Sequence, residues 1–247
     1  RMILSLINQK GGVGKTTNTI HLGACLAQMG KSVLLVDFDS QMDLTHGSGI
    51  RDPQYTIIDL LTGSDKKFRI RTRAENLSIL AGSSDLTAGR FKRDSLKKAL
   101  EPLKAHFDYI LLDCPPEGIN SFSLSLPEIA LNACDNFLIP LFPNEYAVKN
   151  ANSFMGRVME VIKPKNKKLV FSGFFFGKVL VTSKKHKIYS EMMEKVAPSL
   201  MFKNFVRQDS QVEHAVSEGM TIFQFSPNCR AAKDYRKLTK EFMKRTK

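Results

Sequence analysis

The sequence has few cysteines, and they are spaced far apart in the chain. No two of them form a Cys-x-x-Cys pair; the four are Cys25, Cys114, Cys134 and Cys229. Structural zinc sites and disulfide frameworks need clustered cysteines, so this spacing argues against both kinds of site. We therefore expect reduced thiols that are mostly buried.

Long apolar runs, low-complexity linkers and internal repeats are also absent. The longest apolar candidate, LVFSGFFFGKVLV (169–181), contains Lys178 and two glycines. It is shorter than the roughly 18 uncharged apolar residues of a spanning helix. The opening MILSLIN runs directly into a glycine-rich stretch, without a charged and then apolar leader. We expect a cytoplasmic protein without membrane attachment, folded as one domain over 1–247.

Acidic residues are scarce in one part of the chain only. The whole sequence carries 37 Lys and Arg against 24 Asp and Glu, a net charge of +13. Residues 151–247 hold 20 basic and 8 acidic side chains, whereas residues 1–150 hold 17 and 16. The excess of positive charge in the last two-fifths of the chain favours binding of a polyanion there.

What the sequence does contain is an alternation of apolar, β-rich runs with longer amphipathic stretches, which is typical of βαβ units. The predicted strands are 2–8, 32–37, 77–81, 108–113, 136–142, 169–181 and 201–206. The predicted helices are 16–29, 85–104, 121–134, 145–162, 185–197, 210–218 and 229–245. We predict an α/β fold with a mostly parallel twisted sheet that is covered by helices on both faces.

The stretch NQKGGVGKTT follows the first predicted strand and opens the first predicted helix, which is the setting of a phosphate-binding loop. Gly11, Gly12 and Gly14 leave room for backbone N–H groups to face phosphates. Lys15 can meet phosphate oxygens and Thr16 can bind Mg²⁺, while the helix adds the positive end of its dipole. We therefore predict a nucleotide-binding loop.

A second lysine makes this loop unusual. Lys10 lies five residues before Lys15, and Gln9 stands where the strict P-loop pattern has its first glycine. Two ammonium groups on one tight loop repel each other unless an anion lies between them or one points away. Lys10 is therefore either a solvated surface lysine or a second ligand of the phosphates.

Three aspartates follow apolar strands. Asp37 and Asp39 come after VLLV, and Asp113 comes after YILL. Ligands of open parallel sheets bind beyond the carboxyl ends of the strands, so these carboxylates should meet the loop there. One aspartate at a strand end is often only a turn or cap residue, but three at one edge favour a Mg²⁺ site.

These motifs resemble those of a known family. The K-G-G-x-G-K-T-T loop is similar to the deviant Walker A motif of the ParA/MinD ATPases, which are P-loop NTPases. VLLVDFDSQMDLT, YILLDCPP and the segment that begins FVRQDSQVEHAV resemble further ParA segments, so the likeness covers nearly the whole chain. The resemblance implies an ATPase that hydrolyses ATP with Mg²⁺.

The resemblance also implies roles for single residues. Lys10 would reach across an ATP-bound homodimer to the partner subunit's phosphates, which would place both lysines around a triphosphate. Asp39 would orient the attacking water, and Asp37 and Asp113 would lie near the metal with Thr16. The catalytic residues that it implies are Lys10, Lys15 and Asp39. The nucleotide-binding residues are Lys10, Gly11, Gly12, Val13, Gly14, Lys15, Thr16, Thr17, Arg207 and Asp209, the last two near the adenine.

The chain departs from the family pattern after Asp39. Ser40 and Met42 replace the proline and glycine of the ParA segment Asp-Pro-Gln-Gly-Asn, and Asp43 replaces its asparagine. These changes bear on how the segment after Asp39 moves and on the rate of hydrolysis. Cys114 could suggest the iron–sulfur relatives of the family, but those use a cysteine pair at other positions, so no cluster is expected.

Basic side chains of the C-terminal part are the candidates for DNA contact. TSKKHK places three lysines at a predicted helix start, where cations oppose the helix dipole; they are Lys184, Lys185 and Lys187. In ParA proteins basic residues of this region touch DNA phosphates, and Lys203 and Arg207 would extend the patch. A solvated charged face is the alternative. The helix 229–245 has a narrow apolar stripe, which suits packing on the sheet better than lipid insertion, and its basic face is a further candidate for DNA contact.

The resemblance favours a ParA-type ATPase that dimerises on ATP, binds DNA without sequence preference and drives plasmid or chromosome partition. A ParB-like centromere-binding protein would stimulate hydrolysis, and the ATP-bound dimer would associate with the nucleoid. Two alternatives stay open. One is a MinD-like membrane-associated positioning ATPase, and the other is an ATP-liganded DNA-binding regulator with incidental hydrolysis.

Overall fold

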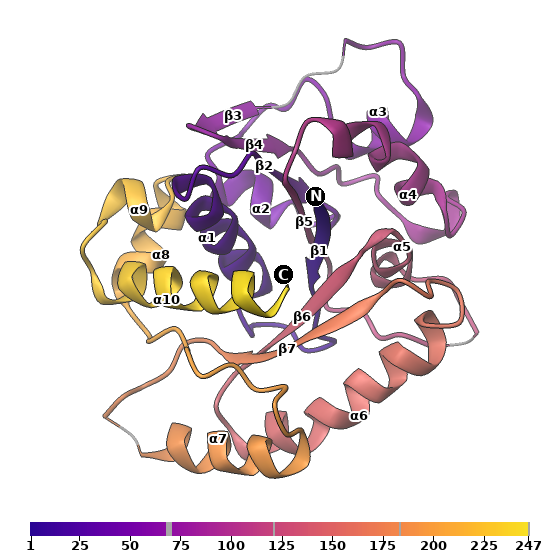
Figure 1. Cartoon of the computed structure of the whole chain (residues 1–247). Helices are drawn as coiled ribbons and strands as arrows, with labels where there is room; N and C mark the ends of the chain where they lie inside the picture. Colours follow the sequence, from indigo (N-terminus) through magenta and orange to yellow (C-terminus); the bar gives the residue numbers. More distant parts are fainter. Residues whose placement is uncertain (68–70, 121, 183, 247) are drawn as a thin grey trace.

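A seven-stranded sheet lies at the centre of the protein (Figure 1). The structure is a computed structural model that describes residues 1–67, 71–120, 122–182 and 184–246, with the backbone alone at 71–73. The strand order is β3-β4-β2-β5-β1-β6-β7. The strands are β1 (Met2–Leu6), β2 (Val33–Asp37), β3 (Arg71–Ala74), β4 (Leu77–Leu80), β5 (Tyr109–Asp113), β6 (Asn136–Leu141) and β7 (Val170–Phe176).

The register of the sheet gathers the strand ends that the sequence singled out. Every pairing is parallel except that of the edge strand β3 with β4. β5 lies between β1 and β2, so that Asp113 is paired with Leu6 on one side and with Asp37 on the other. The predicted α/β fold with a mostly parallel sheet is confirmed, and its carboxyl edge carries the loop and the aspartates.

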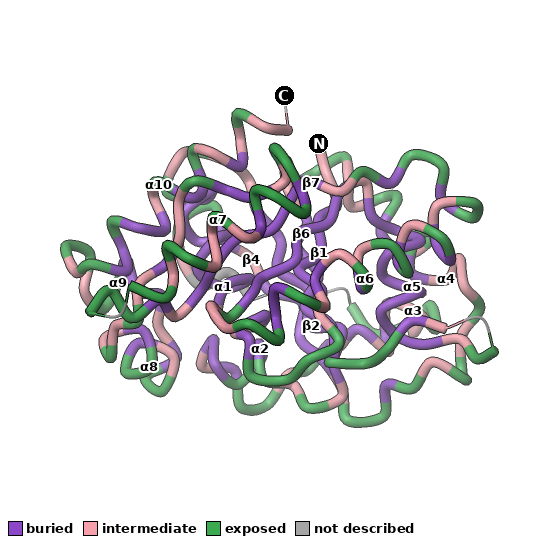
Figure 2. Tube along the Cα trace, turned by 90° about the horizontal axis from the view of Figure 1, so that it is seen from below, coloured by how far each residue is buried: buried purple, intermediate pink, exposed green. Residues whose placement is uncertain are grey.

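Helices cover both faces of the sheet (Figures 1 and 2). One face carries α3 (Ile57–Thr62), α4 (Ser95–Leu100), α5 (Leu126–Ala133), α6 (Glu145–Ile162) and α7 (Lys185–Val196). The other carries α1 (Lys15–Gln28), α2 (Asp43–Gly47), α8 (Ser210–Ser217), α9 (Ile222–Phe225) and α10 (Arg230–Arg245). Neighbouring strand residues enter opposite cores, as Ile3 and Leu4 do, because side chains of a strand alternate between its faces.

Five of the seven predicted helices are confirmed to within one residue at each end, and the other two differ from the prediction. The stretch predicted as one helix over 85–104 is divided into η1 (Ala88–Arg90), α4 and η2 (Pro102–Ala105). Pro102 ends α4, because proline cannot continue an α-helix. α5 begins after Ser125, which forms a capping box with Glu128, and not at residue 121, which lies outside the described residues. The elements α2, α3, α9 and β3 were not predicted.

The predicted strand 201–206 is wrong. One isolated bridge joins this segment to β7. The backbone N–H groups of Lys203 and Asn204 instead donate to the Glu241 carboxylate of α10, at 2.9 Å each. Because these donors are taken, the segment cannot continue as a strand beside β7.

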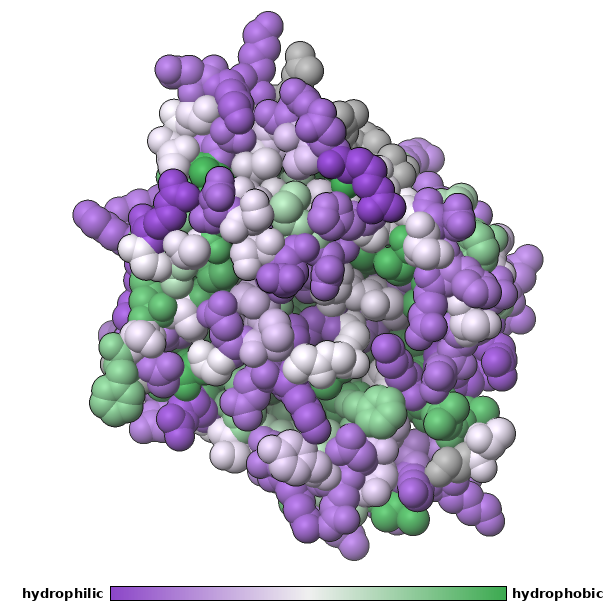
Figure 3. Space-filling view, turned by 180° about the vertical axis from the view of Figure 1, so that it is seen from behind, coloured by the Kyte–Doolittle hydropathy of each residue, from purple (hydrophilic) through white to green (hydrophobic). Residues whose placement is uncertain are grey.

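The structure also bears on the expectations about cysteines and membrane spans. All four cysteines are free and three of them are buried, as expected. No helix within the described ranges is long and apolar enough to cross a membrane. On the face shown in Figure 3, hydrophilic side chains predominate and hydrophobic ones lie among them. The single domain over 1–247 stays a prediction.

Candidate functional site

The glycine-rich loop joins the end of β1 to the start of α1. Gly12 and Gly14 have φ of +75° and +82°, in the left-handed region that glycine adopts without strain. Gly14 is the N-cap of α1 and provides no side-chain cap, so the first N–H groups of the helix are free for an anion. A Cβ on Gly11 or Gly12 would meet no atom within 4 Å, so a ligand has room to approach the backbone there.

The side chain of Lys15 turns inward. The residue is 7% exposed, and its Nζ donates to the backbone carbonyl oxygen of Lys10 at 3.2 Å. Burial lowers the pKa of Lys15, while the carboxylates of Asp113 and Asp39 act in the opposite direction. Lys15 therefore lies between the loop and the acidic residues, where it can meet a phosphate group.

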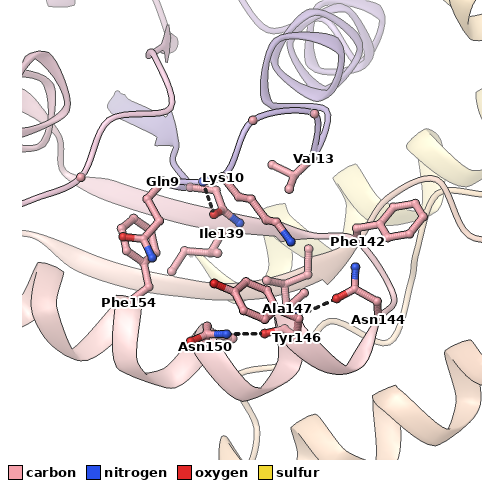
Figure 4. Close-up of a pocket in the computed structure, with 16 residues that line it drawn as sticks. Gln9, Lys10, Val13, Ile139, Phe142, Asn144, Tyr146, Ala147, Asn150 and Phe154 are labelled. Atoms are coloured by element: carbon pink, nitrogen blue, oxygen red, sulfur yellow. Dashed lines mark hydrogen bonds between the residues drawn. The ribbon is translucent and has the colours of Figure 1, made fainter.

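The side chain of Lys10 points from the loop toward α6 (Figure 4). Its Nζ lies 4.2 Å from the centre of the Tyr146 ring, which belongs to the first turn of α6. A cavity of about 630 Å³ separates the loop from α6, and both side chains line it. The side chains of Lys10 and Lys15 therefore point in different directions. This relieves the repulsion between their ammonium groups without an anion between them.

Asp113 is the least satisfied polar residue of this edge. It is 1% exposed, and both carboxylate oxygens lack a partner at hydrogen-bonding geometry in the described part of the chain. Burial raises the pKa of Asp113 well above its usual value, and the Asp37 carboxylate adds to this, while the nearby Thr16 hydroxyl acts against it. A buried carboxylate without partners is costly unless a cation lies beside it.

This donor set fits Mg²⁺ held together with a nucleotide. Asp113 and the Thr16 hydroxyl offer oxygen ligands, the kind that Mg²⁺ prefers. The described residues contain no group of three or more His, Cys, Asp or Glu that could hold a metal ion. The ion would therefore need phosphate oxygens or water to complete its coordination, as is usual for Mg²⁺ in nucleotide sites.

Asp37 has a structural task that the sequence did not suggest. One carboxylate oxygen accepts from the Thr45 backbone N–H at 2.8 Å and from the Thr45 hydroxyl, and the other accepts from the Asp39 N–H. Gly82 completes the cluster, because its N–H donates to the Thr45 hydroxyl and a Cβ at this position would lie 2.8 Å from Cγ of Asp37. Burial raises the pKa of Asp37 to about 6. Its role as a metal ligand stays a prediction.

Asp39 lies nearer the solvent than Asp37. It is 8% exposed, and one of its oxygens accepts from the Gln41 N–H at 3.0 Å. Burial raises the pKa of Asp39, the Gln41 hydrogen bond opposes the shift and Asp43 adds to it. Met42, which replaces the glycine of the ParA pattern, has φ of +58° and precedes α2, so a residue with a Cβ occupies a left-handed position here.

A second cavity, of about 300 Å³, lies beside the loop and is lined by Thr17, Arg207 and Asp209 among others. The guanidinium of Arg207 donates to both oxygens of Asp234, at 2.7 and 2.8 Å. Asp209 accepts from the N–H of Gln211 and so caps α8. The structure thus brings the two predicted adenine residues beside the loop, with their charged groups engaged inside the protein. Contact with a base stays a prediction.

Comparison with known proteins decides the family. A family model described as AAA domain matches residues 1–171. The sporulation initiation inhibitor protein Soj of Bacillus subtilis is 34% identical over 97% of each chain. The chromosome-partitioning ATPase Soj of Treponema pallidum is 32% identical, over 98% of this chain and 97% of that one.

The chain belongs to the ParA/MinD family of ATPases. Its fold is similar to the septum site-determining protein MinD of Pyrococcus horikoshii, solved in complex with Mg-ADP. The TM-score is 0.77 at 26% identity, with 97% of this chain and 95% of that chain covered. The resemblance inferred from the loop and the strand ends is therefore confirmed.

The lysines predicted to contact DNA in this ParA/MinD ATPase lie away from the glycine-rich loop. The three lysines predicted at the start of α7 are exposed, and so is Lys203. The rings of His186 and Phe205 lie 5.2 Å apart and bring the two segments together. Arg207, in contrast, is bound to Asp234 and does not extend this patch.

A further row of lysines lies along α10. Its members follow each other at intervals of four, three and four residues and are all exposed, so they share one face of the helix. None of them forms an ion pair with another described residue, because the α10 acids Asp234 and Glu241 are bound by Arg207 and Arg245. We call this set the α10 lysine row: Lys233, Lys237, Lys240 and Lys244.

Sequence reasoning missed several residues of the two cavities. Asn18 lines the smaller cavity and lies three residues after Lys15, so helical spacing could have placed it on the loop side of α1. Tyr235 lines the same cavity and donates to Asn18 at 2.8 Å. Nothing in the local sequence indicates that contact, because 217 residues separate the two side chains.

Proposed function

We propose that this ParA/MinD ATPase hydrolyses ATP with Mg²⁺ at the carboxyl edge of the sheet. The observation that carries the proposal is the buried Asp113 carboxylate, which has no hydrogen-bond partner among the described residues. It lies near Lys15 and the uncapped start of α1, so a triphosphate with a divalent cation would satisfy all three groups. Bound Mg²⁺ supplies neutralisation of the charge that develops on the phosphates.

The chain's own residues position the phosphates and the water. The loop N–H groups receive phosphate oxygens, and Lys15 exchanges the Lys10 carbonyl for one of them. Asp39, fixed by the Gln41 N–H, is placed to orient the attacking water. Its raised pKa makes this carboxylate a better proton acceptor than an exposed aspartate.

Release of phosphate from ATP tests this assignment. We expect Asp39→Ala to bind ATP and to release little phosphate, whereas Asp43→Ala, a nearby carboxylate of α2, should retain activity. The same variant distinguishes an ATPase whose hydrolysis drives partition from the ATP-liganded DNA-binding regulator. If Asp39→Ala abolishes phosphate release and the protein still functions in cells, hydrolysis is incidental and the regulator describes this chain.

We further propose that the protein forms a homodimer on ATP, in which Lys10 contacts the partner subunit's nucleotide. The support is the direction of Lys10, whose exposed side chain turns away from Lys15. Sizing with a slowly hydrolysed ATP analogue tests it: Lys10→Ala should bind the analogue and stay monomeric. Lys97→Ala, an exposed lysine of α4, is the matched control and should dimerise. A normal dimer peak for Lys10→Ala excludes the role in trans.

We propose non-specific DNA as the polyanion that the basic surfaces bind. Exposed lysines at the start of α7 and in the α10 lysine row suit phosphate contacts, which carry no base information. DNA retardation should then weaken with salt, with a slope of log K against log salt of about −0.9 for each phosphate neutralised.

Charge-matched variants locate the DNA footprint. One variant changes Lys184, Lys185 and Lys187 to Gln. Its control changes three exposed lysines elsewhere to Gln: Lys97, Lys167 and Lys168. Equal losses in both triple variants would show that only net charge matters, and retention of binding in the first variant would exclude the α7 patch.

The biological role that we propose is partition of a plasmid or chromosome, in a cytoplasmic protein that associates with the nucleoid when ATP is bound. The support is the similarity to chromosome-partitioning relatives. A ParB-like centromere-binding protein is the proposed partner. Phosphate release with DNA present should rise when that protein is added, and an unchanged rate would remove it from the proposal.

A MinD-like positioning ATPase is the second candidate. Three apolar side chains, Leu180, Val181 and Ile188, are 52%, 46% and 55% exposed beside the α7 lysines. Apolar groups among cations suit an anionic bilayer better than DNA. Sedimentation with anionic liposomes in ATP and in ADP distinguishes the two. ATP-dependent sedimentation without ATP-dependent DNA retardation would favour the MinD-like role.

A further inference from the structure

The ammonium group of Lys10 rests on an aromatic ring. Its Nζ lies 4.2 Å from the centre of the Tyr146 ring, well within the range of a cation–π contact. Tyr146 is 63% exposed, so this ring is not part of the hydrophobic core. Figure 4 shows Lys10 reaching from the loop toward the ring across the cavity.

The backbone of Lys10 is held by two other groups. Its N–H donates to the Asn8 side chain at 3.0 Å, and the Asn8 amide donates to the carbonyl of Pro140 on β6. The carbonyl oxygen of Lys10 accepts from the Lys15 ammonium at 3.2 Å. This last bond joins the two lysines of the loop. It uses the Lys15 ammonium, which the proposed function assigns to a phosphate group.

The ring belongs to a residue in the first turn of α6. Asn144 caps this helix by accepting from the Ala147 N–H at 2.7 Å, which fixes the turn that carries Tyr146. The ring is therefore attached to a capped turn of a helix, whereas Lys10 carries its ammonium at the end of a long side chain with several rotatable bonds.

We propose that Tyr146 is a positioning residue that holds Lys10 in the nucleotide-free protomer and releases it when a nucleotide draws Lys15 away from the Lys10 carbonyl. This inference rests on the proposed function, in which Lys10 acts in the partner subunit's site. The contact keeps Lys10 out of its own phosphate site and adds a step between nucleotide binding and dimerisation.

The expected effect follows from the strength of an exposed cation–π contact, which changes an equilibrium by about 2- to 5-fold. Each protomer of a homodimer releases one lysine, so the dimerisation constant changes by the square of that factor, about 5- to 30-fold. Tyr146→Leu, which lacks the ring, should dimerise more tightly in a slowly hydrolysed ATP analogue. Tyr146→Phe, which keeps the ring, should match the unchanged protein.

Sedimentation equilibrium of these variants gives the first test. Phe225→Leu removes a partly exposed ring of α9 and is the matched control, expected to leave dimerisation unchanged. Weaker dimerisation of Tyr146→Leu would overturn the proposal, because the ring would then support the dimer. Equal dimerisation of Tyr146→Leu and the unchanged protein would overturn it as well.

A spectroscopic signature gives the second test. In protein with ¹³C-methylated lysines, which keep their charge, the resonance of Lys10 is identified by its loss in Lys10→Arg. It should show an upfield ring-current shift that Tyr146→Phe retains, and that Tyr146→Leu and the ATP analogue each abolish. A shift that survives in Tyr146→Leu, or in the presence of the analogue, would contradict the release.

The two proposals fail in different ways. If Lys10→Ala forms a normal dimer, the role of Lys10 in trans is wrong, whatever Tyr146 does. If Lys10→Ala stays monomeric while the Tyr146 variants dimerise like the unchanged protein, only the positioning role of Tyr146 is wrong.

Discussion

At the carboxyl edge of the sheet, Lys15, Asp37 and Asp113 are almost completely buried, and burial shifts the pKa of each away from its usual value. On α7 and α10 the lysines are exposed, and those of the α10 lysine row have no ion-pair partner in the described part of the chain. In the proposed function both regions bind phosphate groups: the first binds the few phosphates of a nucleotide, and the second binds the many phosphates of DNA.

The two regions differ in how strongly a single charged side chain interacts with its neighbours. Charges interact strongly where water is excluded, so a buried group determines the properties of its neighbours. Exposed charges are screened by salt within about 8 Å at physiological ionic strength. We therefore expect large effects of single substitutions at the nucleotide edge, and small additive effects on the basic exterior.

The largest effect is expected at Lys15. Lys15→Ala removes a buried cation that the proposed function places at the phosphates, and loss of one such group typically lowers turnover by about 100- to 1,000-fold. Phosphate release at saturating ATP and Mg²⁺ measures it, with Lys97→Ala as the exposed control. A loss for Lys15→Ala no larger than that of the control would break the contrast between the two regions.

The next effect concerns His21, a buried residue of α1 that contacts α9 and α10. This α1 residue is fully buried, its ring lies 5.2 Å from Tyr235 of α10 and its Nδ1 accepts from the Ile222 N–H of α9. Its Nε2 has no hydrogen-bond partner among the residues that the structure describes. Burial lowers the pKa of His21 to about 3.

The sign of the pH dependence follows from this shift. Between its unfolded pKa of 6.5 and about 3, His21 binds a proton only in the unfolded chain. The free energy of unfolding should therefore fall as the pH drops from 6.5, by about 3 kcal/mol at pH 4. His21→Leu should remove this part of the slope in urea unfolding at pH 4 to 7, whereas His106→Leu, at an exposed site, should keep it.

A smaller effect is expected at Gly82. A Cβ there would lie 2.8 Å from Cγ of Asp37, whose carboxylate is fixed by Thr45. Gly82→Ala should therefore lower the free energy of unfolding by about 1 to 3 kcal/mol, the usual cost of overpacking. Gly89→Ala is the matched control, because its Cβ would meet no atom within 4 Å. Urea unfolding of both should separate them, and equal stability would show that the edge tolerates added volume.

The smallest effect is expected for single members of the α10 lysine row. Lys240→Gln should reduce the slope of log K for DNA against log salt by about 0.9, and a second substitution in the row should add to it. Retardation at several salt concentrations measures the slope. Complete loss of DNA binding in Lys240→Gln would show that one exposed lysine dominates, contrary to the comparison.

Much of the nucleotide edge could be predicted because its signals are local. The glycines, Lys15 and the three aspartates lie within short motifs, and a parallel sheet brings the ends of its strands to one edge. The bounds of α1 and α6 followed from periodicity and from residues close in sequence.

The sequence by itself determined the loop, the order of apolar strands and the family to which they belong. Only the tertiary structure decided the partners of Lys10 and Asp37, which are Tyr146 and Thr45, and the course of 201–206, which Glu241 of α10 diverts. These contacts join residues far apart in the chain or on different elements. Periodicity and propensity report the preferences of one segment, whereas the choice between neighbours depends on which segments the sheet brings together.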